Sequence, residues 1–171
     1  MIGITELIGE VVKATSERNG QEIRYVFGNT EYIKEQLDMI SHDGSILKLP
    51  MIALFCPIVE QRGLLDCDSL VHINLIIACS TTHELSNEER EQASFKDVLR
   101  PIYNDFLATL MSDERFYFGY QKTIRHKYSE NYSYGRYGAY TANDEAVSEP
   151  IDAIDIRDME IKIKELNTCR K

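Results

Sequence analysis

The sequence predicts an α+β fold, in which a mostly antiparallel mixed sheet packs against a long helix and shorter flanking helices. Segments with the helical spacing of apolar residues are mixed with segments in which apolar and polar residues alternate. They do not follow the regular strand–helix–strand order of parallel sheets, so the class is α+β. The chain has 171 residues, which suits one domain with its own core, and we expect a single domain over residues 1–171.

The first half of the chain alternates between helix and strand patterns. Apolar residues at helical spacing begin at Ile4, and a second helix, capped by Asn29 or Thr30, should extend to about Ile40. Strands are expected at Glu22–Phe27, Met51–Phe55 and Leu70–Cys79, the last being the strongest strand pattern in the chain. The short polar excursion Val59–Asp68 joins the last two, which should therefore be antiparallel neighbours.

A long helical stripe follows, from Phe95 to Leu110, after a capping signal at Ser86 and Glu89. Pro101 lies inside this stripe, so either the helix kinks there or a second helix begins with Pro101 in its first turn. Ser112 and Asp113 should end it.

The C-terminal part holds three different segments. Residues 116–140 are rich in tyrosine without a clear period, residues 141–150 are a polar acidic linker, and residues 151–166 alternate like a strand. The parity of the alternation changes between Ile156 and Met159, which indicates a β-bulge or a bend.

Composition and charge restrict the classes of function. The net charge of −9 disfavours a general coat for duplex DNA, because phosphate binding needs clustered Lys and Arg. No apolar run approaches the length of a membrane span, so we expect no membrane association. Glu6 and Glu10 near the start are unlike a secretory leader, which suggests a protein of the cytoplasm or of a particle assembled there.

Catalytic signals are sparse. The sequence contains no glycine-rich phosphate loop and no common hydrolase or zinc-protease motif. The four cysteines are widely and irregularly spaced, so we expect free thiols without metal. An alternative function is a small metal-dependent hydrolase that uses His72, Asp66 and Asp68, although a half-buried sheet histidine and a solvated acidic turn explain the same residues.

The tyrosine-rich segment is the most informative feature for function. Tyrosine together with arginine is typical of protein interfaces, whereas an ordinary strand pair with exposed aromatics, or stacking on single-stranded nucleic acid, would need the same residues. Residues 116–140 are net basic and residues 144–158 net acidic. Opposed patches suit head-to-tail contact between copies, and ion pairing within one chain is the competing explanation. The candidate interface residues are Tyr128, Tyr132, Tyr134, Arg136, Tyr137, Asp152 and Asp155.

The order of several segments resembles the tail terminator and neck proteins of tailed bacteriophages, which are ring subunits that join head and tail. The matching segments are an amphipathic N-terminal helix, a helix at Tyr32–Ile40, the runs Lys48–Phe55 and Val71–Ala78 leading to Ser80-Thr81-Thr82, Asn87–Arg90 before Phe95–Tyr103, a stretch with His126, and Asp152–Ile156.

This resemblance implies a mixed sheet flanked by helices and no enzymatic activity or cofactor. It also implies a virion location at the head–tail junction, after assembly in the host cytoplasm. The expected partners are further copies of the chain, in a ring of six or twelve subunits, and phage portal, neck or tail proteins. Non-specific proximity to DNA is a further expectation. The tyrosine-rich segment has no counterpart in the family pattern.

Overall fold

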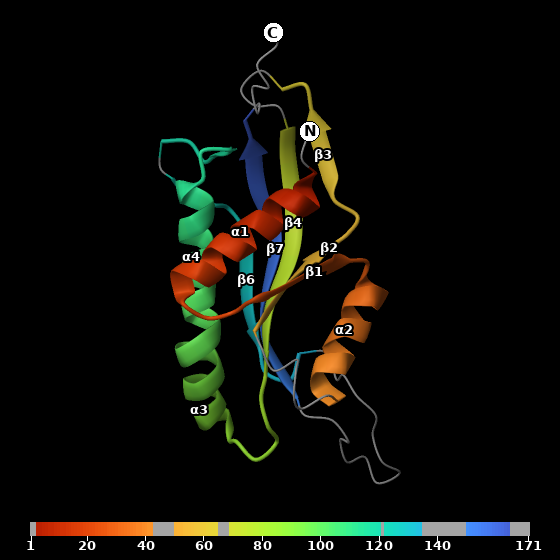
Figure 1. Ribbon diagram of the computed structural model, residues 1–171, viewed down its shortest axis with the longest axis vertical. Coiled ribbons are helices and arrows are strands. Elements are labelled where there is room, and N and C mark those ends of the chain that lie inside the picture. Colours follow the sequence, from red (N-terminus) through yellow and green to blue (C-terminus); the bar gives the residue numbers. More distant parts are fainter. Residues whose placement is uncertain (1–2, 43–49, 65–68, 121, 135–149, 165–171) are drawn as a thin grey trace.

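The computed structural model describes residues 3–42, 50–64, 69–120, 122–134 and 150–164. Within them, seven strands form one curled mixed sheet, and a long helix of 26 residues packs along it. Figure 1 shows this helix running beside the sheet, with α1 (Ile4–Asn19) crossing the same side. The predicted α+β class is confirmed.

The helices begin and end close to the predicted positions. α1 ends at Asn19 and is followed by Gly20, whose left-handed backbone (φ 75°) suits a glycine C-cap. α2 covers Thr30–His42. The long helix starts at a capping box: the Ser86 side chain accepts a hydrogen bond from the Glu89 N–H, and the Glu89 carboxylate accepts one from the Ser86 N–H.

Pro101 does not interrupt the long helix. The helix comprises α3 (Asn87–Arg90), a π-helical stretch η1 (Glu91–Leu99) and α4 (Arg100–Ser112). The Arg100 N–H donates to the Phe95 carbonyl, five residues back. Because a proline ring crowds the carbonyl four residues before it, the wider π-helical turns directly ahead of Pro101 let the helix continue.

The sheet has the strand order β1-β2-β4-β7-β5, with β3 beside β4 and β6 beside β7. β1 pairs with β2 in parallel, and all other pairs are antiparallel. The predicted antiparallel pairing of β2 with β4 is therefore confirmed. The strands are β1 (Arg24–Gly28), β2 (Met51–Phe55), β3 (Val59–Arg62), β4 (Ser69–Ser80), β5 (Phe116–Tyr117), β6 (Lys127–Asn131) and β7 (Ile151–Ile163).

The predicted bulge lies in β7, opposite Asn74 of β4. Ile73 pairs with Met159 and Leu75 with Ile156, so Arg157 and Asp158 together face Asn74. Asp158 has a left-handed backbone (φ 52°), and its N–H donates to the Asn74 side chain at 2.9 Å. The side chain of Asn74 thus satisfies the backbone group that the bulge removes from the ladder.

The strand β3 was not predicted, and for the segment that holds β5 and β6 a strand pair was only one of the alternatives. β3 lies in the segment that we expected to be an irregular excursion, and β5 and β6 lie in the segment without a clear period. All three are short, and most of their side chains are exposed or only partly buried. Their place in the sheet depends on backbone pairing with β4 and β7, which leaves little apolar pattern in the sequence.

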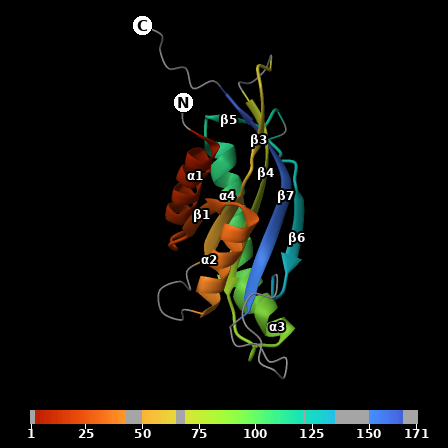
Figure 2. The ribbon, with the colours of Figure 1, turned by 90° about the vertical axis from the view of Figure 1, so that its right-hand side faces the viewer.

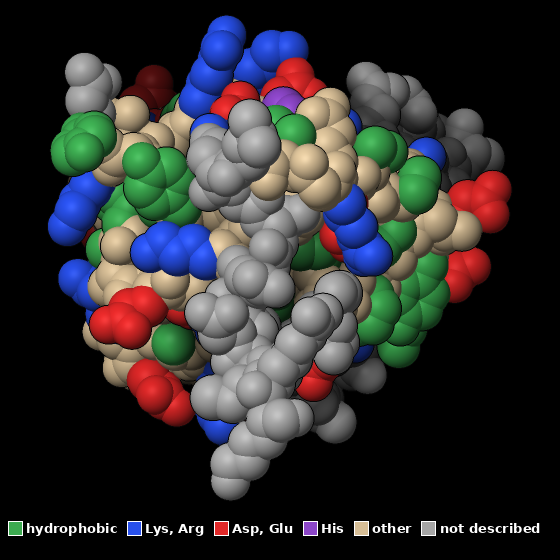
Figure 3. Space-filling view, turned by 90° about the horizontal axis from the view of Figure 1, so that it is seen from above, with side chains coloured by type: hydrophobic (Ala, Val, Ile, Leu, Met, Phe, Trp, Pro, Cys, Tyr) green, Lys and Arg blue, Asp and Glu red, His purple; other side chains and the backbone are tan. Residues whose placement is uncertain are grey.

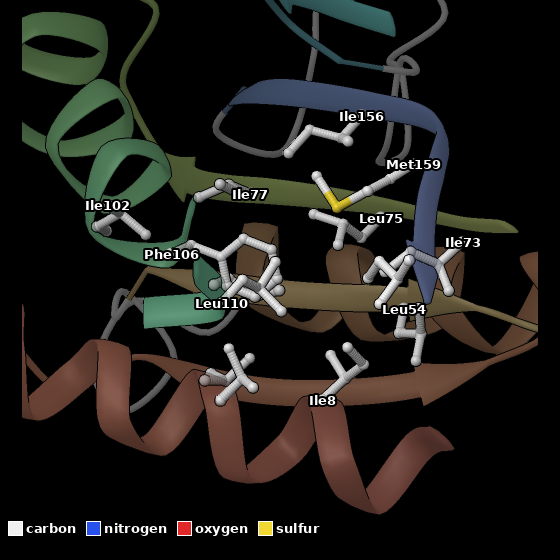
Figure 4. Packing of buried hydrophobic residues seen from close by; sticks show 14 of the residues in the cluster. Ile8, Leu54, Ile73, Leu75, Ile77, Ile102, Phe106, Leu110, Ile156 and Met159 are labelled. Carbon is white, nitrogen blue, oxygen red and sulfur yellow. The ribbon is translucent and has the colours of Figure 1, made fainter. Parts of the chain in front are cut away.

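Apolar side chains cover both faces of the sheet. On one face, α1 and the long helix pack against β4 and β7, and Figure 4 shows Ile102, Phe106 and Leu110 of α4 directed toward the strands. On the opposite face, Ile33 and Leu37 of α2 pack against a smaller group on β1, β2, β4 and β7. Figure 2 shows β6 beside β7 at the outer margin of the sheet. None of the helices within the described residues is long and apolar enough to cross a membrane.

Replacing the fully buried Phe106 by alanine should lower the free energy of unfolding by about 3–5 kcal/mol, because the change leaves a cavity under the long helix. Met111→Ala on the same helix is the control, since Met111 is 36% exposed and should change stability by only about 0.5 kcal/mol. Urea unfolding of both variants measures the difference. Equal effects would contradict the packing of Phe106 between the long helix and the sheet.

Candidate protein interface

A chain of aromatic and charged side chains joins β6 to the long helix. We call Glu91, Arg100, Tyr128, Glu130 and Tyr132 the tyrosine–charge network. Arg100 donates two hydrogen bonds to the Glu130 carboxylate, at 2.7 and 2.9 Å, and pairs with Glu91 at 2.8 Å. The Tyr128 hydroxyl donates to Glu130 at 2.5 Å and the Tyr132 hydroxyl to Glu91 at 2.6 Å. Each tyrosine is therefore held by a carboxylate that Arg100 also holds.

Strand alternation explains why β6 can make these contacts. Tyr128 and Glu130 are two residues apart, so both side chains point to the face that the long helix covers. The Tyr128 ring meets Tyr103 edge to face at 4.9 Å, and the Tyr103 hydroxyl lies 2.7 Å from His126 Nε2. Tyr128 remains 41% exposed and Tyr132 37% exposed. Both rings are thus fixed in place and still accessible from solvent.

The network also sets the protonation of its members. The hydrogen bond to Glu91 raises the pKa of Tyr132 to about 12. Burial, followed by the bond to Glu130, raises the pKa of Tyr128. The bonds from Tyr132 and Arg100 lower the pKa of Glu91, and the bonds from Arg100 lower the pKa of Glu130. Near neutral pH the tyrosines therefore stay protonated donors and the glutamates stay charged acceptors.

Asp152 lies inside the protein. Its side chain is fully buried and forms an ion pair with Arg90 of α3, with Arg90 Nε 3.1 Å from Oδ2. Asp152 also accepts a hydrogen bond from the Ser133 N–H, and Arg90 lies over the Tyr132 ring. Asp152 therefore anchors the turn after β6 to the long helix, and its carboxylate is occupied within the chain.

The other predicted interface residues are divided between two places. Tyr134 is half-buried beside the core under α2, and Asp155 pairs with Arg157 on that same face. Tyr128 and Tyr132 lie on the opposite face, which the long helix covers. Arg136 and Tyr137 lie outside the described residues. The structure thus brings Tyr128, Tyr132 and Asp152 near one another and separates them from Tyr134 and Asp155.

Among the described residues, an ion pair joins the basic segment 116–140 to the acidic segment 144–158. Lys127 lies 2.6 Å from Asp158, and Arg157 lies 2.8 Å from Asp155. Intrachain pairing, the competing explanation, therefore accounts for Lys127 and Asp158, whereas the Arg157–Asp155 pair lies within the acidic segment. Seen from above, the described part of the surface carries both signs of charge with hydrophobic side chains between them (Figure 3). Such a mixture does not favour phosphate binding on this face.

A pocket of about 260 Å³ lies under the start of α2. Its lining includes Lys34, Asn74, Tyr134 and Arg157, but not His72, which is exposed on β4. Asp66 and Asp68 lie outside the described residues, within which no three His, Cys, Asp or Glu side chains are grouped to hold a metal. The described lining of the pocket therefore lacks His72, one of the three residues that the hydrolase alternative needs.

Two of the four cysteines can be described. Cys56 and Cys79 are free thiols, and Cys67 and Cys169 lie outside the described residues. Burial, with the nearby charge of Asp152, raises the pKa of Cys79 to about 12. Cys79 therefore packs as a small apolar group and is not a reactive thiolate.

No protein-family model matches this chain, and no curated protein matches it. The candidate interface consequently depends on the chain's own geometry.

Sequence reasoning identified Tyr128 and Tyr132 but missed the charged residues that fix them. Arg90, Glu91 and Arg100 lie at least 30 residues away from the partners that they bind in the tyrosine segment. The one local signal was the alternation of Tyr128, Glu130 and Tyr132, which is the period of a strand.

Arg90→Met should lower the free energy of unfolding by about 3–5 kcal/mol, because it leaves the buried Asp152 charge without a partner. The double variant Arg90→Met, Asp152→Asn should recover part of that loss, since it removes the buried charge and keeps an acceptor for Ser133. Urea unfolding measures both variants. A double variant as unstable as the single one would contradict this assignment.

Glu130→Gln should destabilise the protein at pH 7, and this effect should disappear in acid. Because Arg100 lowers the pKa of Glu130 below its unfolded value of about 4.3, the pairing contributes fully above that value and is lost as the pH falls through the lower folded-state pKa. Urea unfolding over a pH series tests this, with the exposed Glu114→Gln as control. A difference that does not depend on pH would argue against the pairing.

Proposed function

We propose that this chain is a structural virion protein of a tailed bacteriophage, a ring-forming tail terminator or neck subunit at the head–tail connection. The supporting observation is that Tyr128 and Tyr132 are exposed yet held by Glu130 and Glu91. Aromatic side chains that are already fixed lose little conformational entropy when a partner covers them. They are therefore suited to bind protein.

The head–tail location rests on the resemblance in the order of segments. An N-terminal helix, a strand and second helix, a pair of antiparallel strands, a long helix and a C-terminal strand follow one another along the chain. In this proposal the protein works by binding neighbouring copies and portal, neck or tail proteins, without a cofactor or a catalysed reaction. It is assembled in the host cytoplasm and becomes part of the virion.

Native mass spectrometry of the purified full chain, followed by negative-stain microscopy, tests this proposal. We expect a closed oligomer of six or twelve copies with a central hole. A chain that stays monomeric at every concentration, and does not form rings on purified phage tails, would overturn it.

Tyr132→Ala should reduce the fraction of protein that assembles into closed oligomers, because it removes an exposed aromatic side chain that is already fixed in place. Tyr117→Ala is the matched control, since Tyr117 is also 37% exposed but lies on β5. Circular dichroism during thermal unfolding separates a lost contact from a lost fold, since Tyr132 also packs on Phe95. Equal loss of rings in the two variants would place the contact elsewhere.

A further inference from the structure

The sheet has an open strand at each side. β1 pairs only with β2, and β6 pairs only with β7, within the part of the chain that the structure describes. Both strands have five residues. An unpaired edge offers a row of backbone donors and acceptors to another strand.

On β1, the backbone groups that face outward belong to Tyr25 and Phe27. The Arg24 N–H donates to the Pro50 carbonyl at 2.9 Å, and the Gly28 carbonyl accepts from the Cys56 N–H at 2.8 Å. These bonds show that the even-numbered residues of β1 direct their backbone N–H and C=O groups toward β2. Because successive residues of a strand direct their backbone groups to opposite sides, the N–H and C=O groups of Tyr25 and Phe27 point away from the sheet.

On β6, the outward groups belong to Tyr128 and Glu130. The Thr81 N–H donates to the Pro150 carbonyl at 3.0 Å. The even-numbered residues at the start of β7 therefore direct their backbone N–H and C=O groups toward β4, and the odd-numbered residues direct theirs toward β6. The β6 partners of those odd-numbered residues are Lys127, Ser129 and Asn131. Tyr128 and Glu130 therefore direct their backbone groups outward.

The strand directions and the side-chain faces at the two edges are compatible with pairing between two copies. β1 is parallel to β2, and three successive antiparallel pairings then lead to β6, so β6 runs antiparallel to β1. The side chains of Tyr25 and Tyr128 both lie on the face covered by α1 and the long helix. A second copy that continues the sheet in the same sense can thus place Tyr128 opposite Phe27 and Glu130 opposite Tyr25. Each pair would exchange both of its backbone bonds.

The side chains around the two edges are complementary. Phe27 is 50% exposed and Tyr128 41% exposed, and a cross-strand aromatic pair would cover both. Glu31 and Glu35 are exposed on α2 after β1, and Arg125 is exposed just before β6. β1 also lacks the Lys or Pro that commonly protects an edge. The outward residues of β3, in contrast, are the charged Glu60 and Arg62.

We propose that copies of this chain join head to tail by strand addition, with β1 of one copy pairing with β6 of the next. This inference rests on the proposed function and identifies the two surfaces that form the ring. Because the two surfaces differ, the contact is heterologous. It generates a ring when the rotation that relates successive copies brings the last copy into contact with the first.

Proline at an outward position tests each edge separately. Phe27→Pro and Glu130→Pro each remove an outward N–H, and proline is tolerated there because it breaks no bond within the sheet. Phe27→Ala and Glu130→Ala are the matched controls, since they lose the same side chain and keep the N–H. Native mass spectrometry should show loss of the ring in both proline variants and a larger residual ring fraction in both alanine controls. Circular dichroism should show that all four variants are folded, with the two Glu130 variants destabilised to a similar extent because both lose the bonds to Arg100.

Mixing the two proline variants gives the sharpest readout. Each retains one intact edge, so a mixture should form a one-to-one heterodimer that cannot grow, while each variant alone stays monomeric. If β1 paired with β1 of another copy, the Glu130→Pro variant would still dimerise alone, which would overturn the proposal.

The outcomes also separate this inference from the proposed function. If the wild-type chain forms a ring and both proline variants still form it, the β1–β6 contact is overturned and the proposed ring function stands. A wild-type chain that forms no ring would overturn both.

Discussion

The antiparallel pairing of β4 with β7 is the interaction on which the rest of the structure depends. These are the longest strands of the sheet, with 12 and 13 residues, and every other strand except β1 pairs with one of them. Both present alternating apolar side chains to the long helix. Burial of this surface contributes to the hydrophobic stabilisation of the fold, and the short strands β3, β5 and β6 pair with these two long strands.

The bulge opposite Asn74 keeps this pairing compatible with one core. Without an extra residue, the apolar side chains on either side of it, Ile156 and Met159, would point to opposite faces of the sheet. With it, both lie under the helices. The cost is a left-handed backbone at Asp158, a residue type that tolerates this conformation.

At β6 the balance of forces is different. Polar and aromatic contacts with the long helix, above all Arg100 with Glu130, add to the backbone pairing that holds this strand beside β7. Because these contacts act on one face of the strand, they leave its outer backbone edge uncovered. The same residues therefore stabilise the chain and fix the surface that we assign to a neighbouring copy.

The sequence by itself determined the elements whose apolar period is strong: both flanking helices, the long helix with its capping box, the central strands and the bulge in β7. It also pointed to Tyr128 and Tyr132. Only the tertiary structure decided the position of β3 and β6, the burial of Asp152 with Arg90, and the edges that stay open. Apolar periodicity is a local property and can be read along the chain, whereas backbone pairing of polar strands and ion pairing between distant residues depend on which segments the folded core brings together.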